Sequence, residues 1–405
     1  CLSPLVRCNT HAPTLRPQHL GCSTEGLRAC AAQPSPMMEG QQRLVSQRAL
    51  RREVPTMFSN PDFQTQQATS ASTEHVKALA LSMGDPAGIG PEVLLKALHR
   101  LGAPACSPSQ AEQIDTEPKL AVRVFGDPEW LMQRANELGL GEVLQKASWI
   151  QWESACSVPR TLPQGVASAE GGACAVAAVL AAANAVIAGA CRALVTAPLN
   201  KQAMHLAGFD YPGHTELLAE LADRCPVRMM LEHQHLRTVL HSIHLSLRQA
   251  LDALDRASLL ETFSIADRAL GRMLGRRPRL LLAALNPHAG EAGAFGREEI
   301  ELLSPCVSQA QAQGFSILGP YAADSVFAMA WDNPEVDAVI ALYHDQGLIP
   351  IKLLGMDLGV NITLGLPFVR SSPDHGTAFD IVGRGLARED SFLAAMRAAH
   401  RYSLV

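Results

Sequence analysis

The stretch ALYHDQGLIPIKLLGMDLGVNITLGLPFVRSSPDHGTAFDIVGRG (residues 341–385) places single polar side chains in a strongly apolar setting. It continues from the hydrophobic run of residues 336–342, which predicts a buried strand. The isolated polar residues that follow this strand are His344, Lys352, Asn361 and Arg370. Such side chains are costly to bury without partners. They therefore pair with one another or bind a polar ligand, and the rest of the sequence favours a ligand.

Further apolar runs alternate with helical patterns from residue 76 onward. Strands are predicted at residues 76–83, 120–127, 192–198, 237–244, 279–285 and 336–342. This alternation is typical of βαβ units and predicts an α/β fold with a mostly parallel sheet. The Ala-rich residues 171–190 are long enough to cross a membrane, but they predict a buried helix because they include Asn184. Residues 150–168 are predicted to be irregular.

Composition excludes several classes of protein. The chain has 405 residues, of which 47% are hydrophobic, so it can form two globular domains of ordinary size. A net charge of −5 has the wrong sign for a general nucleic-acid binder. Of the ten cysteines, the six after residue 100 form no CxxC pair. This spacing predicts free thiols and a reducing, cytoplasmic location.

Residues 1–75 differ from the rest of the chain. They are rich in arginine, proline, glutamine and serine without periodicity, which predicts disorder. An Arg-rich, acid-poor composition also fits a transit peptide. We favour an upstream extension of the reading frame, with Met57 as the true start.

Polar residues come just after each of six predicted strands. They are Asp85, Asp127, Thr196, His244, Asn286 with His288, and His344. In open α/β sheets, ligands bind beyond the carboxyl ends of the strands. Loops are polar in any protein, but they contain Ser, Asn and Gly as often as His. The pattern therefore predicts an active-site cleft.

Three of these residues, His244, His288 and His344, are candidate metal ligands. Three imidazoles suit Zn, Co, Ni or Fe and leave open positions for a substrate. No HExxH-like spacing links them, and single histidines are commonly structural or exposed. Competing candidates nearby are His233, His235 and His241.

A second group of residues suits an anionic ligand. The motif GHTE places His214 and Thr215 at a predicted helix start, where free backbone amides can bind an anion. Thr215 is equally suited to be a simple N-cap. Lys352 and Arg370 provide positive charge and Asn361 a neutral donor. Solvated surface charges are the alternative, which the apolar flanking residues disfavour.

Two Gly- and Pro-containing motifs are less specific. GDPAGIGPE (residues 84–92) matches neither GxGxxG nor a Walker loop, so it predicts only a tight strand-to-helix turn with Pro91 near the helix start. In TAPLNK (residues 196–201), Lys201 is equally compatible with a surface position.

Together these motifs resemble the 4-hydroxythreonine-4-phosphate dehydrogenase family of vitamin B6 biosynthesis. The motifs are GDPAGIGPE, VTAPLNK, GHTE, ALNPHAGE, FGREE, YHDQGLIPIK and VNITLGLPFVRSSPDHGTAFDIVGRG. The resemblance implies a fold like that of isocitrate and isopropylmalate dehydrogenases, with an active-site cleft between two α/β domains of a homodimer. The expected domains are residues 76–200 with 346–405, which hold the cofactor loop, and residues 201–345, which hold the metal ligands and the dimer interface.

The resemblance also implies roles for individual residues. His244, His288 and His344 match the ligands of a divalent ion (Zn, Mg or Co), with His344 coming from the partner subunit. The substrate-binding positions match His214, Thr215, Lys352, Asn361 and Arg370, of which Lys352 and His214 are the catalytic candidates. By analogy with the loop that holds the NAD adenosine in the related dehydrogenases, the cofactor candidates are His375, Gly376 and Asp380.

The implied reaction is an NAD- or NADP-dependent oxidation of 4-phosphohydroxy-L-threonine, followed by loss of CO2. The proton acceptor is left open, since Lys352 could act as the base only in its neutral form. A related dehydrogenase for threonate or erythronate 4-phosphate, or for an aromatic cis-dihydrodiol carboxylate, is the first alternative. A three-His metal lyase or hydrolase without nicotinamide is the second. No nucleic-acid or membrane partner is expected.

Overall fold

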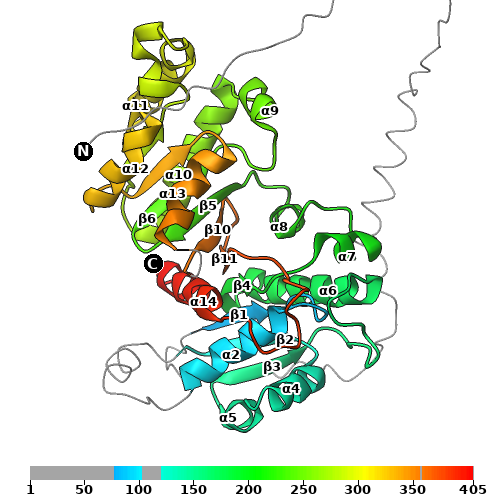
Figure 1. Ribbon diagram of the computed structural model, residues 1–405. Helices are drawn as coiled ribbons and strands as arrows, with labels where there is room; N and C mark the ends of the chain where they lie inside the picture. Colours follow the sequence, from blue (N-terminus) through cyan, green and yellow to red (C-terminus); the bar gives the residue numbers. More distant parts are fainter. Residues whose placement is uncertain (1–76, 103–119, 356–357, 405) are drawn as a thin grey trace, which may run out of the picture. The chain divides into compact units, whose positions relative to one another are not determined.

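The computed structural model describes residues 77–102, 120–355 and 358–404. Their central feature is one long mixed sheet (Figure 1). These residues form 11 strands. Across the sheet the strands are β3 (Ile150–Ser154), β2 (Val122–Gly126), β1 (Ala78–Ser82), β4 (Cys191–Thr196), β11 (Val369–Pro373), β10 (Val360–Leu364), β5 (Arg228–His233), β6 (Leu236–Leu240), β9 (Ala338–Ala341), β7 (Leu280–Ala283) and β8 (Ile317–Tyr321). The α/β class is confirmed. The predicted extension, residues 1–75, lies outside the described residues.

Two parallel parts of the sheet meet at an antiparallel centre. Strands β3, β2, β1, β4 and β11 are parallel, as are β6, β9, β7 and β8. Between them, β10 is antiparallel to β11 and β5, and β5 is antiparallel to β6. The two parallel parts therefore run in opposite directions. The prediction of a mostly parallel sheet is confirmed. The prediction that six strands end at the same edge of the sheet is wrong.

All six predicted strands are present, as β1, β2, β4, β6, β7 and β9. The five missed strands lack a continuous apolar run. Strands β3 and β8 lie at the two edges of the sheet and bury only their first residues fully. Strands β10 and β11 contain the polar residues Asn361 and Arg370, which interrupt their apolar pattern. Residues 150–168 were expected to be irregular, but β3 occupies their first five positions.

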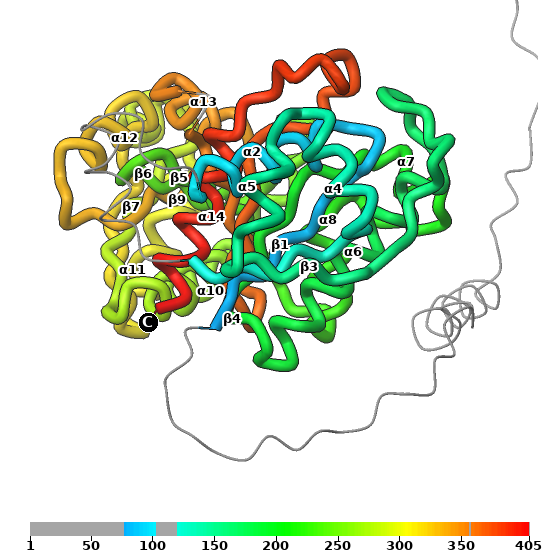
Figure 2. The backbone as a smooth tube through the Cα atoms, turned by 90° about the horizontal axis from the view of Figure 1, so that it is seen from below, coloured from blue at the N-terminus to red at the C-terminus, as the bar shows by residue number. Residues whose placement is uncertain are grey.

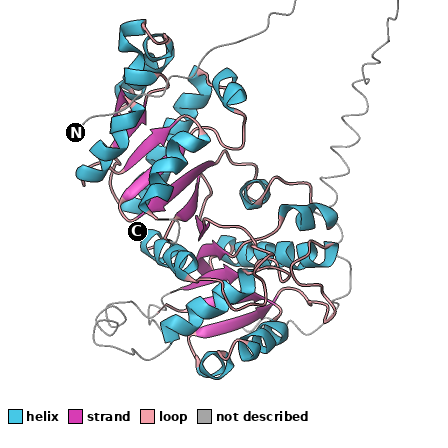
Figure 3. Cartoon of the chain, in the orientation of Figure 1, coloured by secondary structure: helices cyan, strands magenta, loops and turns pink. Residues whose placement is uncertain are grey.

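Helices cover both faces of the sheet (Figure 3). The α-helices are α2 (Gly90–Gly102), α4 (Pro128–Glu137), α5 (Gly141–Lys146), α6 (Ala169–Ile187), α7 (Lys201–Leu206), α8 (His214–Leu221), α9 (Leu247–Asp252), α10 (Arg256–Leu274), α11 (Ser304–Ala312), α12 (Ala323–Asp332), α13 (His344–Leu354) and α14 (Asp390–Tyr402). A 3-10 helix η1 (Pro287–Gly293) and a π-helix η2 (Glu299–Leu303) precede α11. Residues 247–274, whose pattern is helical throughout, divide into α9 and α10 because Asp255 caps α10 by accepting from the Ser258 amide.

The Ala-rich segment forms α6, which packs against β1, β2 and β4. Among the described residues it is the one helix long and apolar enough to cross a membrane, and more than half of it is buried inside the protein. Gly172 lets it approach α7 closely, because a Cβ there would lie 2.0 Å from the Ala203 carbonyl oxygen. The prediction of a buried helix is confirmed.

The turn between β1 and α2 brings two of the sequence motifs together. The Asp85 amide donates to the Pro198 carbonyl (2.9 Å), and Asp85 Oδ1 accepts from the Ala87 amide (2.9 Å). Gly84 has φ +76°, and a Cβ there would lie 2.5 Å from the Pro198 oxygen. GDPAGIGPE is therefore held against TAPLNK, and Pro91 is the second residue of α2, as predicted.

The C-terminal helix returns to the strands that begin the described chain. Figure 2 shows α14 beside α2 and β1, and it also packs against β4, β10 and β11. Helix α13, which the expected division assigns to the first domain, packs against β5, β6 and β9. The two-domain division itself stays a prediction.

Candidate active site

A cavity of about 340 Å³ lies beside the antiparallel centre of the sheet. It is lined from several elements: the end of β4, the start of α8, the segment after β6, the start of α13, and β10 with β11. The predicted site residues that line it are His214, Thr215, His244, His344, Asn361, Arg370, His375 and Gly376. Residues separated by more than 150 positions in the sequence thus share one cavity.

Three predicted site residues lie outside the lining of this cavity. Lys352 borders it, since its Nζ lies 3.2 Å from Oδ2 of Asp374, which does line the cavity. His288 is exposed on η1, and Asp380 is exposed in the loop after β11.

Arg370 is the most deeply buried charge at the cavity, with 2% of its surface exposed. Its Nη1 donates to Thr363 Oγ1 (3.1 Å) and its Nη2 to Thr196 Oγ1 (2.7 Å), while Nε has no partner. Burial lowers the pKa of Arg370 to about 10, partly offset by the negative charge of Glu216. Both of its hydrogen-bond partners are neutral hydroxyls. A buried guanidinium without an ion pair is costly unless an anion joins it.

His214 is the first residue of α8 and lines the cavity next to Arg370. Burial, and then the positive charge of Arg370, hold its pKa well below the usual range, so the imidazole is neutral at neutral pH. Its Nε2 is buried without a partner. The N-cap of α8 is Gly213, so the alternative role of Thr215 as N-cap is wrong.

Four buried polar atoms of cavity-lining residues lack a partner among the described residues. They are His214 Nε2, Asn361 Oδ1, Arg370 Nε and His375 Nε2. Buried polar atoms in folded proteins almost always form hydrogen bonds. Their convergence on one cavity indicates that it binds a polar ligand.

His244 and His344 lie side by side at the cavity, with ring centroids 6.1 Å apart. His344 Nδ1 is 2.7 Å from Asp345 Oδ1, which leaves Nε2 for a ligand, as in many metal sites. Burial, and then the charges of Lys201 and His344, lower the pKa of His244. Two imidazoles at this separation suit a shared divalent ion.

The third predicted ligand, His288, does not join this pair within one chain. Its ring lies near exposed Phe295, with centroids 6.1 Å apart, and among the described residues no three His, Cys, Asp or Glu side chains form a metal-binding group. The competing histidines have other contacts. His235 bonds the Trp331 carbonyl and His241 bonds Thr262, while His233 is buried at the end of β5.

The predicted cofactor loop is held against the β1–α2 turn. The Ile89 amide donates to the Thr377 carbonyl (3.0 Å), and a Cβ on Gly88 would lie 2.8 Å from Thr377 Cβ. Gly165 packs in the same way on the Phe379 carbonyl. GDPAGIGPE, which by sequence predicted only a turn, thus supports this loop.

Not every polar residue after a strand belongs to the cavity. Asp127 caps α4 through the Trp130 amide (3.0 Å) and accepts from the Val158 amide (2.9 Å). Asn286 donates to Glu298 and Glu299. For these two residues the expected place in the cleft is wrong, because their side chains form hydrogen bonds away from the cavity.

The sequence did not single out several residues that line the cavity. Glu216 and Asp374 are the carboxylates among them. Both lie inside recognised motifs, GHTE and SSPDHG, so motif membership was the available signal. Lys201 also lines the cavity although it is exposed, whereas Thr196, which the sequence did place in the predicted cleft, lines it as an acceptor for Arg370.

Several known proteins are similar to this chain in sequence and in fold. The family model described as "Pyridoxal phosphate biosynthetic protein PdxA" matches residues 118–399. The 4-hydroxythreonine-4-phosphate dehydrogenase of Beijerinckia indica subsp. indica is 42% identical over an alignment of 337 residues, and the match covers 80% of this chain and 94% of that protein. The D-threonate 4-phosphate dehydrogenase of Salmonella typhimurium is 41% identical over an alignment of 334 residues, and the match covers 80% of this chain and 98% of that protein.

A solved structure agrees with these matches. The crystal structure of 4-hydroxythreonine-4-phosphate dehydrogenase from Klebsiella pneumoniae is 39% identical, with a TM-score of 0.69, and covers 81% of this chain and 99% of that one. The resemblance predicted from the motifs is thereby confirmed. The chain belongs to the PdxA family of pyridoxal phosphate biosynthetic proteins.

Proposed function

We propose that this chain oxidises 4-phosphohydroxy-L-threonine with NAD⁺ or NADP⁺ in pyridoxal 5'-phosphate biosynthesis. The product, 2-amino-3-oxo-4-phosphooxybutanoate, loses CO2 to give 3-amino-2-oxopropyl phosphate. The observation that carries the proposal is the set of four unpartnered polar atoms around buried Arg370. The relatives named as dehydrogenases of phosphorylated four-carbon acids support it.

The anionic groups of this substrate match the basic and neutral donors of the cavity. Arg370 has an unpaired Nε and no carboxylate partner, so it suits the phosphate or the carboxylate. The Lys352 ammonium, already near Asp374, would neutralise the second anionic group. Thr215 and Asn361 would complete the hydrogen bonds and orient the substrate.

The proton of the substrate hydroxyl needs an acceptor in the cavity. His214 is neutral at neutral pH and its Nε2 is free, so it can accept this proton. Lys352 lies beside a carboxylate, which suits an ammonium that binds an anion. We therefore assign the acceptor role to His214 and the binding role to Lys352.

The residues present also suit a divalent ion. His244 and His344 of one chain would hold it, and a bound ion would supply Lewis-acid polarisation of the substrate's oxygen. His344 was expected from the partner subunit, but it already lies beside His244 in the same chain. Exposed His288 is better placed to reach a second copy. We propose a homodimer, active in the cytoplasm, in which His288 completes the neighbouring site.

His375, Gly376 and Asp380 remain the candidates for binding the nicotinamide cofactor, which would accept the hydride. The first two line the cavity and Asp380 is exposed five residues further on. Their position at the cavity supports a role for this loop in binding the cofactor.

D-threonate 4-phosphate is a second candidate substrate, favoured by the similarity to the Salmonella typhimurium relative. It differs from 4-phosphohydroxy-L-threonine in the group next to the carboxylate, while both carry the phosphate. The deciding experiment compares kcat/KM for both compounds with NAD⁺ and with NADP⁺, followed by reduced-nicotinamide absorbance. Oxidation of neither compound would overturn the proposal. Substrate consumption without nicotinamide reduction would favour the lyase or hydrolase alternative.

A further inference from the structure

A second cavity, of about 430 Å³, opens at the opposite ends of the strands that form the active site. It is lined by Arg192 near the start of β4, Val369 at the start of β11 and Thr363 in β10. The active-site cavity is lined instead by Thr196 and Ser372, near the other ends of β4 and β11. The two cavities are therefore separated by the length of these strands.

The charged residues that line this second cavity are all basic. They are Lys77, Arg192 and Arg272, with no Asp or Glu beside them in the lining. Within the described ranges, none of the three forms an ion pair with a carboxylate. Their summed positive charge favours an anionic ligand over a neutral one.

One carboxylate lies behind the cavity wall but does not offset this charge. The Tyr402 hydroxyl, at the cavity, donates to Glu232. Glu232 is buried and already paired with Arg237 (2.7 Å) and with Arg401. The guanidinium groups of Arg237 and Arg401 thus neutralise the charge of Glu232, so this carboxylate does not offset the positive charge at the cavity.

Arg192 makes the need for an anion more specific. Its guanidinium donates to Nδ1 of His400, and its Nε is buried without a partner. Burial, and then the charge of Arg192, lower the pKa of His400, so this partner is a neutral imidazole. Arg272 donates to the Leu366 carbonyl (3.3 Å), which also carries no full charge. Both guanidiniums are bonded only to neutral groups among their contacts in the described chain.

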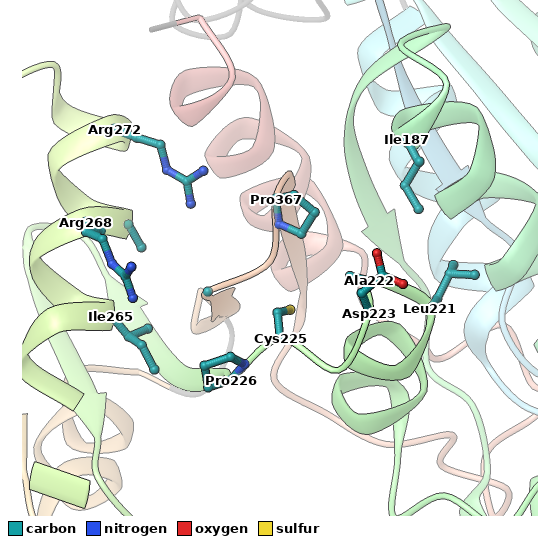
Figure 4. Close-up of a pocket in the computed structure, with 12 residues that line it drawn as sticks. Ile187, Leu221, Ala222, Asp223, Cys225, Pro226, Ile265, Arg268, Arg272 and Pro367 are labelled. Atoms are coloured by element: carbon teal, nitrogen blue, oxygen red, sulfur yellow. The ribbon is translucent and has the colours of Figure 1, made fainter. Parts of the chain in front are cut away.

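A larger recess continues from the second cavity and gives room for the rest of a ligand. It has a volume of about 720 Å³ and shares Arg272 and Pro367 with the second cavity. Figure 4 shows Arg268 and Arg272 on α10, with Pro367 between Arg272 and the wall that carries Asp223. An anionic group held at Arg272 could therefore belong to a molecule larger than phosphate itself.

A hydrogen bond connects this cavity with the active site. Thr363 lines the second cavity, and its Oγ1 accepts from Nη1 of Arg370, which lines the active site. A ligand that shifts Thr363 would change the position of the buried guanidinium that suits the substrate's anionic group. Such a contact gives coupling between the two cavities a physical route.

We propose that the second cavity binds a small phosphorylated metabolite, and that its occupancy changes the affinity of the active site for an anion through Thr363 and Arg370. The binding site stands without the proposed function. The coupling rests on it, because it requires Arg370 to bind an anion in the active site.

Inorganic phosphate, titrated calorimetrically into the full chain, tests the binding. Wild type is expected to bind two phosphates per chain, one in each cavity. Arg272→Gln should weaken the phosphate of the second cavity at least tenfold, while a phosphate still binds in the active site with an affinity changed only by the proposed coupling. Arg256→Gln removes the same charge from an exposed position on the same helix and should retain both. Unchanged binding of both phosphates in Arg272→Gln would overturn the site.

The outcome separates this proposal from the proposed function. Suppose that wild type binds only one phosphate and that Arg272→Gln abolishes this binding. This result would support the site in the second cavity and would count against an anion site at Arg370. An Arg192→Gln/Arg272→Gln variant also removes the second basic side chain. Its circular dichroism and thermal unfolding show whether a loss of binding is due to a loss of fold. A wild type whose phosphate sites all persist in this folded double variant would also overturn the proposal.

A double-mutant cycle with Thr363→Val tests the coupling. Arg272→Gln should change the active-site affinity for phosphate by threefold or more in the wild-type background. The same substitution should have no effect in the Thr363→Val background, where Arg370 has lost this acceptor. An equal effect in both backgrounds would exclude Thr363 as the connection.

Discussion

Arg370 is a buried guanidinium held by two threonine hydroxyls. We expect Arg370→Met to lower kcat/KM for the phosphorylated substrate by about 100-fold, since a buried charged hydrogen bond to a ligand contributes on the order of 2–5 kcal/mol. The fold should persist or gain stability, because the substitution removes a buried charge without a counter-ion. Steady-state kinetics and thermal unfolding measure both effects. Arg256→Met, on the exposed side of α10, is the control, and equal kinetic losses in both variants would contradict the assignment.

His241 predicts how stability depends on pH. Burial, and then the charge of Arg228, lower its pKa in the folded chain to about 4. The unfolded chain binds the proton near pH 6.5, so stability is fully present above that pH and falls as the pH drops toward 4. Linkage gives a loss of about 2 kcal/mol between pH 7 and pH 5 from this residue.

Urea unfolding at pH 7 and pH 5 measures this effect, with His241→Gln as the comparison. Glutamine can keep the hydrogen bond to Thr262 but has no proton to bind. The variant should lose less stability than wild type on acidification. The same loss in both proteins would show that His241 is not the titrating group.

At the level of helices and strands, alanine substitutions at two glycines in long helices are expected to change the stability of the fold in opposite directions. A Cβ on Gly172 of α6 would lie 2.0 Å from the Ala203 carbonyl oxygen, whereas a Cβ on Gly271 of α10 would lie 3.8 Å from the Arg276 carbonyl oxygen. Gly172→Ala should therefore destabilise the fold by about 1–3 kcal/mol through overpacking. Gly271→Ala should stabilise it by about 0.5–1 kcal/mol through helix propensity. Denaturant unfolding compares the two, and a gain in stability in Gly172→Ala would contradict close packing of α6 on α7.

The strands that sequence could predict are those with continuous apolar runs. β1, β4 and β9 are buried along nearly their whole length, so hydrophobicity alone locates them. β10 and β11 carry Asn361 and Arg370 toward the cavity, so the polar residues that make them functional interrupt the strand pattern. Together with the antiparallel pairing of β5 and β6, their antiparallel pairings leave the two parallel parts of the sheet running in opposite directions. Local patterns contain no information on such pairing, because it depends on contacts between distant segments.

Over the whole molecule, the sequence motifs predicted which residues lie at the site better than they predicted which subunit contributes each of them. His214, Asn361 and Arg370 share one cavity as the resemblance implied. The histidine trio could not be assembled from sequence, since spacing does not say which chain supplies each ligand. His244 and His344 pair within one chain and His288 lies apart, so the proposed trio would take its third ligand from a second copy.

Mixing two inactive variants tests this arrangement. His288→Ala removes only the ligand offered to the neighbouring site, and Arg370→Met disables only the chain's own site. If subunits exchange at random, half of the dimers contain one of each, and one of their two sites has every residue intact. The mixture should therefore recover about a quarter of wild-type activity, while each variant alone is inactive but folded. If His344 were the shared ligand instead, this mixture would stay inactive and His344→Ala mixed with Arg370→Met would recover. Chelation and metal add-back before each assay ensure that recovery reports the shared site and not a difference in metal content.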